Sequence, residues 1–142
     1  TYMEHLRDNR CTFSPLKPLT EAEMRFLDED ISKQIVGYNT IPCNDCKYCM
    51  PCPYGINIPA ALLYYNKCVN EGNIPESSQS ADYRRARRAF LVGYDRALPA
   101  VRQANHCIGC GECVGHCPQR IQIPEELQRI DHLVEQLKQE TL

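Results

Sequence analysis

The stretch from Cys43 to Pro59 reads CNDCKYCMPCPYGINIP, and the stretch from Cys107 to Pro124 reads CIGCGECVGHCPQRIQIP. Eight of the ten cysteines of the 142-residue chain lie in these two runs. Three cysteines of the first run recur 64 positions later, and the pattern CPxxIxIP that follows them recurs 65 positions later. The chain is therefore built around an internal repeat, with one residue inserted in the second copy.

The second run has the spacing CxxCxxCxxxCP, which is typical of bacterial two-cluster ferredoxins. In that pattern three closely spaced thiolates bind one iron-sulfur cube, and the fourth cysteine, which precedes a proline, binds the other cube. Gly109, Gly111 and Gly115 suit a loop that wraps closely around inorganic sulfide. The spacing predicts 4Fe-4S clusters.

The first run departs from this spacing, because only two residues separate Cys49 from Cys52. The repeated CPxxIxIP still keeps Cys52 equivalent to Cys117, so we predict two clusters that exchange these two ligands. The predicted ligands of cluster 1 are Cys43, Cys46, Cys49 and Cys117, and those of cluster 2 are Cys107, Cys110, Cys113 and Cys52.

Two other chemistries use clustered cysteines. Zinc sites usually take two separated CxxC pairs and have no need for four cysteines at three-residue steps before a proline. Disulfides belong to small secreted proteins, and we see no charged segment followed by an apolar one at the start of the chain. We therefore expect a cytoplasmic protein, in which Cys11 is a free thiol and Cys68 is a buried core residue.

Residues 1–19 are expected to be a tail or linker, because Pro15 and Pro18 oppose regular structure. A helical domain is expected over 20–142. Thr20 and Glu23 have the spacing of a capping box, and the apolar pattern that follows predicts a helix over 21–36.

Each CPxxIxIP segment leads into a further predicted helix that starts at a proline, Pro59 or Pro124. In these two helices, Leu62, Tyr65, Cys68 and Val69 align with Leu127, Ile130, Leu133 and Val134 as one apolar face. A helix is also predicted over 81–96, with Ala86, Ala89, Phe90 and Gly93 toward a neighbour. The fold class is therefore mainly α, with a pseudo-twofold repeat of cysteine loop plus helix.

The formal net charge of −2 gives no field that attracts nucleic acid or an anionic membrane. The uncharged stretch over 48–66 contains three prolines and does not suit a membrane span. We therefore expect neither nucleic acid nor a membrane as partner. One local exception is an arginine group that either docks an acidic redox partner or forms a solvated helix face: Arg84, Arg85, Arg87 and Arg88.

Four side chains close to the cysteines in the sequence are candidates for tuning the reduction potential of a cluster. The alternative for each is a solvent-facing loop position. These residues are Lys47, Tyr48, His106 and His116. No phosphate-binding glycine loop, nucleophile elbow or acid/base pair is visible. The chain by itself therefore offers no catalytic site.

Together the two runs look like the C-terminal iron-sulfur extension of a bacterial branch of the aldo/keto reductase family. The segment TFSPLKPLTE, from Thr12 to Glu21, resembles the exit from the last barrel helix of those enzymes. The resemblance implies an α-helical ferredoxin-like fold, and it implies that Thr1 begins a fragment. A TIM-barrel reductase would then precede it and hold NAD(P)H and the catalytic residues.

Electron transfer through two 4Fe-4S clusters is the leading interpretation, with the upstream reductase domain or a redox protein as partner. The alternative is a structural interaction module that holds zinc or a redox-silent cluster. A third possibility is a cluster that senses oxygen.

Overall fold

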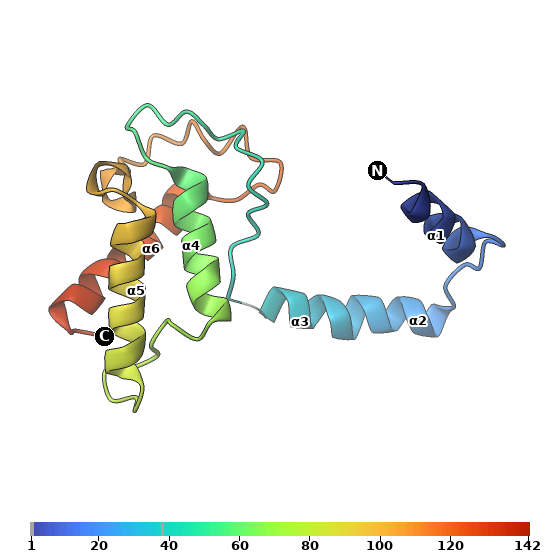
Figure 1. Cartoon of the computed structure of the whole chain (residues 1–142), viewed down its shortest axis with the longest axis horizontal. Helices are drawn as coiled ribbons and strands as arrows, with labels where there is room; N and C mark the ends of the chain where they lie inside the picture. Colours follow the sequence, from blue (N-terminus) through green and yellow to red (C-terminus); the bar gives the residue numbers. More distant parts are fainter. Residues whose placement is uncertain (1, 38) are drawn as a thin grey trace. The chain divides into compact units, whose positions relative to one another are not determined.

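The computed structural model describes residues 2–37 and 39–142, and it divides into two compact units, Thr1–Asn39 and Thr40–Leu142 (Figure 1). Throughout the described residues the regular structure consists of helices, with no β-strand. The prediction of a mainly α protein is therefore confirmed. Within the same residues, no helix combines the length and the apolar character that crossing a membrane requires.

The first unit begins with helix α1, Met3–Phe13, which the sequence analysis did not anticipate. Our expectation that the prolines exclude regular structure from this segment is wrong, because Pro15 and Pro18 lie beyond the end of α1. Glu4 in its first turn and Arg10 in its last turn both complement the helix dipole.

The helix predicted over 21–36 is present as three consecutive segments: α2 (Glu21–Arg25), a π-helical stretch (Phe26–Ile31) and α3 (Ser32–Gly37). The predicted capping box is also confirmed. Glu23 N donates to Thr20 Oγ1 at 3.3 Å, and Thr20 N donates to Glu23 Oε2 at 2.8 Å. The two residues thus satisfy backbone donors at the helix start that have no partner within the helix.

The second unit contains three longer helices, α4 (Ile58–Asn70), α5 (Tyr83–Ala97) and α6 (Ile123–Gln139), and the two cysteine runs form loops at one end of them (Figure 1). Short 3-10 turns at Ala100–Arg102 and Ala104–His106 connect α5 to the second run.

Each repeat helix begins at an isoleucine, Ile58 or Ile123, one residue before the proline at which we predicted its start. Pro59 and Pro124 stand in the first turns of α4 and α6. The isoleucines of both IxI segments are buried: Ile56, Ile58, Ile121 and Ile123. They anchor the end of each cysteine loop in the core.

The predicted apolar faces of α4 and α6 do form the core. The residues that are almost fully buried are Leu62, Tyr65 and Cys68 on α4 and Leu127, Ile130 and Val134 on α6. Val69 and Leu133 are half-buried against them. Cys68, with 2% of its surface exposed, is a core residue as predicted.

Helix α5 packs closely on α4 because Gly93 has no side chain. A Cβ at this position would collide with the Tyr64 hydroxyl, which donates to the Phe90 carbonyl at 2.8 Å. Phe90 is fully buried, and its ring lies 5.7 Å from that of Tyr64. Gly93 therefore faces a neighbouring helix, as predicted.

Arg87 departs from the solvated helix face that we considered for the arginine group. Its Nε donates to the Leu137 carbonyl at 2.5 Å, and its guanidinium lies 3.2 Å from the Glu140 carboxylate. Because the last carbonyls of a helix have no partner within it, Arg87 satisfies one at the end of α6.

Candidate metal centre

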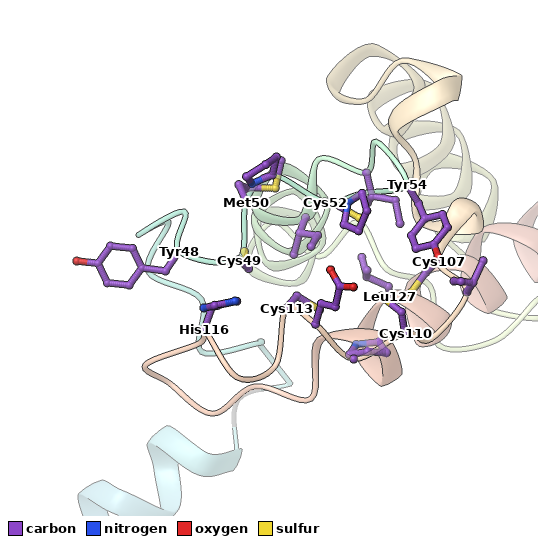
Figure 2. A pocket seen from close by; sticks show the side chains of 18 residues that line it. Tyr48, Cys49, Met50, Cys52, Tyr54, Cys107, Cys110, Cys113, His116 and Leu127 are labelled. Atoms are coloured by element: carbon purple, nitrogen blue, oxygen red, sulfur yellow. The ribbon is translucent and has the colours of Figure 1, made fainter.

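Two cavities lie among the cysteine loops, and each is lined by cysteines from both runs. The larger cavity, about 200 Å³, has Cys52 from the first run beside three cysteines of the second: Cys107, Cys110 and Cys113 (Figure 2). The smaller cavity, about 20 Å³, has Cys117 from the second run beside three cysteines of the first: Cys43, Cys46 and Cys49. The structure thus brings together the same two sets of four that the spacing predicted.

Cys49 lines both cavities, so it forms part of the wall between them. Its thiol is also close enough to the second run to affect Cys113, whose pKa it helps to raise. The two sites are therefore direct neighbours.

The two loops share the same backbone conformation at equivalent positions. In the first run Asp45 and Lys47 have φ values of 56° and 64°, and in the second run the equivalent Gly109 and Gly111 have 75° and 78°. Gly55 and its equivalent Arg120 are likewise left-handed, with φ values of 80° and 54°. Residues other than glycine disfavour this left-handed region, yet Asp45, Lys47 and Arg120 adopt it. The two loops therefore keep the same backbone path even where their residue types differ.

Turn hydrogen bonds repeat in the same way. Met50 N donates to Lys47 O in the first run, and Val114 N donates to Gly111 O in the second, both at 3.0 Å. After the final cysteine of each run a second turn follows. Gly55 N bonds to Cys52 O and Arg120 N bonds to Cys117 O, again at 3.0 Å. The residue inserted in the second run lies between these two turns and leaves both intact.

The helices close the inner side of each cavity with apolar side chains. Ile58 and Leu127 line the larger cavity, and Leu62 and Ile123 line the smaller one. All four are almost fully buried. The cysteines thus lie between the hydrophobic core and solvent. Two of them, Cys46 and Cys110, are exposed.

Burial is the main cause that raises the pKa values of three thiols in the runs, those of Cys43, Cys49 and Cys113. Desolvation, followed by the charges of Cys107, Cys110 and Cys49, raises the pKa of Cys113 to about 11. Desolvation also raises the pKa values of Cys43 and Cys49, against the effect of backbone hydrogen bonds. Thiolates in such a group repel one another, so a cationic centre that binds them displaces their protons and relieves the repulsion.

The four candidate tuning residues take different places. Tyr48 and His116 line the larger cavity, although the ring of Tyr48 projects away from it (Figure 2), and Lys47 lines the smaller cavity. His106 lines neither cavity, because its Nε2 lies 3.0 Å from the Ala100 carbonyl within the connecting turns.

Several further residues on the wall of the larger cavity were not predicted as part of the site, among them Tyr54, Ile108 and Glu112. Ile108 and Glu112 stand between cysteines of the second run, so their position in the motif was the available signal. Tyr54 follows Cys52 and Pro53, and only the fold shows that it lines the cavity together with residues of the second run.

A protein-family model described as "4Fe-4S dicluster domain" matches residues 42–122. The match includes both cysteine runs and the helices between them. No curated protein and no solved structure matches the chain.

Proposed function

Because this chain belongs to the 4Fe-4S dicluster domain family, we propose that it transfers single electrons through two 4Fe-4S clusters. The proposed ligands of the first cluster are Cys43, Cys46, Cys49 and Cys117, and those of the second are Cys107, Cys110, Cys113 and Cys52. The family supports electron transfer in general. The number of clusters and the ligand sets are our proposal.

The observation that carries this proposal is that each cavity is lined by all three closely spaced cysteines of one run together with Cys52 or Cys117 from the other run, with Cys49 shared between the two cavities. A single zinc ion needs four sulfurs at about 2.3 Å from one point. Within the described ranges, no three His, Cys, Asp or Glu side chains form a group that could hold one ion in this way. The larger cavity, with about 200 Å³ between its thiols, has room for a larger inorganic group.

When bound, a 4Fe-4S cluster supplies a centre that takes up and releases one electron at a time. The chain's own residues place its ligands and control their surroundings. Ile58 and Leu127 exclude water from the inner side of the larger cavity, and the left-handed positions turn the loop backbone around the cysteines. Low polarity and nearby amides are the features through which proteins set cluster potentials.

The shared position of Cys49 supports electron exchange between the two proposed clusters. A ligand of the first cluster that also forms the wall of the second cavity leaves only a short gap for the electron to cross. The electron can then enter near one exposed ligand and leave near the other, because Cys46 and Cys110 belong to different sets.

The reaction context that we propose is a reductase of the aldo/keto type, with the two clusters linking a redox partner to a nicotinamide-dependent barrel. Its support is the likeness of the two runs and of the Thr12–Glu21 segment to such enzymes. The partner would be that reductase domain or a separate redox protein. We propose a cytoplasmic location because a reducing compartment keeps thiols available to metal.

The test is a visible spectrum of the anaerobically purified chain before and after dithionite, with iron, sulfide and zinc analysis. We expect a broad band near roughly 400 nm that bleaches on reduction, with about eight irons and eight sulfides per chain. A chain that keeps about two zincs and takes up no iron and sulfide on reconstitution would instead support the structural alternative.

The ligand sets are tested with single serine variants. Cys52→Ser and Cys117→Ser should each reduce the iron content, and Cys11→Ser and Cys68→Ser should leave it unchanged, because the latter two cysteines line neither cavity. Full iron content in Cys52→Ser would show that the ligand exchange is wrong.

A further inference from the structure

The exposed face of α5 carries a row of arginines at four-residue spacing. Arg84, Arg88 and Arg96 are exposed and lie one turn or two turns apart along the helix, with Val92, 43% exposed, between the last two. Residues four apart lie above one another on a helix, so these side chains form one continuous strip. We call Arg84, Arg88, Val92 and Arg96 the α5 strip.

The arginines of the strip have no role in holding the fold together. Arg85 pairs with Asp82 at 3.2 Å, and Arg87 pairs with Glu140, but among the described residues none of the strip's three arginines has a hydrogen bond or an ion pair. Like charges four residues apart also destabilise a helix. Arg84 and Arg88 therefore add little to the stability of the fold and remain available for contact with a partner.

The charge of the chain is distributed unevenly. The whole chain has a net charge of −2, yet α5 contains five arginines and one aspartate. The surface along the strip is formed by residues of α5 alone and is open to solvent, whereas Gly93 beside it faces Tyr64 of α4. Exposed arginines on such a surface can form bidentate bonds with the carboxylates of a partner.

The turn that follows the C-terminal end of α5 lies near the wall of the larger cavity. Beyond Arg96, α5 ends at Ala97 and the chain turns back through Ala100–Arg102. The Val101 carbonyl there lies 3.7 Å from the Cβ position of Gly55, which follows Tyr54 on the wall of the larger cavity. A partner lying along α5 would therefore end beside the site of Cys52 and Cys107.

We propose that the α5 strip is the docking surface for an acidic redox protein that presents a row of carboxylates. The proposal rests on the proposed electron transfer and adds the surface and the charge of the partner. Electrostatic attraction of this kind mainly raises the association rate, and it weakens as salt screens the charges.

The test is stopped-flow oxidation of the fully reconstituted, reduced chain by an acidic flavodoxin as the probe. We compare the wild type with Arg84→Gln/Arg88→Gln/Arg96→Gln. The control, Lys17→Gln/Lys33→Gln/Arg10→Gln, removes the same three charges from exposed positions outside α5. We expect the rate constant at low ionic strength to fall about tenfold or more in the strip variant and little in the control.

Two results would overturn the proposal. One is a strip variant that reacts within twofold of the wild type at low ionic strength. The other is equal loss in the control, which would show an effect of overall charge. Tight binding of a 20-base-pair DNA to the wild type alone, with unchanged flavodoxin rates, would assign the strip to nucleic acid. Reduction of the chain by dithionite is recorded in each sample, so a failure of electron transfer itself is seen separately.

Discussion

Asn66 makes two hydrogen bonds to the backbone of Ile41, one from Ile41 N to Asn66 Oδ1 and one from Asn66 Nδ2 to Ile41 O, each of 2.7 Å. Asn66 is on α4, and Ile41 is buried two residues before Cys43. The Asn66 side chain on α4 thus fixes the segment that leads into the first cysteine run.

Replacing Asn66 with alanine should therefore loosen the entry to the smaller cavity. We expect a loss of about 2 kcal/mol in the free energy of unfolding, because two partly buried backbone groups lose their partners. Urea unfolding followed by circular dichroism measures this. The control is Asn105→Ala, whose side chain is exposed, and equal stability of the two variants would contradict the role of Asn66.

Gly111→Ala should destabilise the second cysteine loop by about 1 kcal/mol, because φ is 78° there and a Cβ is strained in that region. Gly115→Ala is the matched control: its φ is not positive, and no atom lies within 4 Å of the added Cβ. The rate of cluster loss in air and the urea midpoint should both change in the first variant only.

Gly93→Ala should cost about 1–3 kcal/mol, because the new methyl group collides with the Tyr64 hydroxyl. Removing that hydroxyl with Tyr64→Phe should recover part of the loss. A double-mutant cycle measured by thermal unfolding tests this coupling. Additive effects of the two changes would argue against close packing of α4 and α5 at this point.

Arg87→Ala and Arg88→Ala should differ although the residues are neighbours. Arg87 binds the end of α6 through Leu137 and Glu140, so its loss should cost about 1–2 kcal/mol. Arg88 is exposed and should change stability by less than about 0.5 kcal/mol. Urea unfolding midpoints of the two variants measure this difference in stability. Similar midpoints would contradict the anchoring role of Arg87.

Cys46→Ala and Cys49→Ala should affect the two sites differently. Cys46 lines only the smaller cavity, so its loss should remove about four of eight irons. Cys49 lines both cavities, so its loss should also change the electron paramagnetic resonance spectrum of the remaining reduced cluster. Identical spectra for the remaining cluster in both variants would show that Cys49 does not influence the second site.

The repeat helices were predictable because their signals are local. Pro59 and Pro124 mark helix starts, and the apolar faces that contain Leu62 and Leu127 follow the helical period in the sequence. Helix α1 was not predicted because Pro15 and Pro18 oppose helical structure. Both prolines lie beyond Phe13, the last residue of α1, so they do not interrupt this helix.

The role of Arg87 was missed because its partners are fifty residues away. Nothing in the pattern RRARR distinguishes Arg87 from Arg88, since both are arginines on the same helix. Only the packing of α5 against α6 brings one of them to the carbonyl of Leu137.

The sequence by itself determined the iron-sulfur character of the chain, because cysteine spacing and the repeat are properties of the chain, and from them we predicted the eight thiols and the two sets of four. Only the tertiary structure decided which other residues surround them. Tyr54 lines the same cavity as residues of the second run, and Cys49 lines both cavities, so the walls combine segments far apart in the chain. They depend on how the helices pack, and packing is set by the burial of side chains from the whole unit.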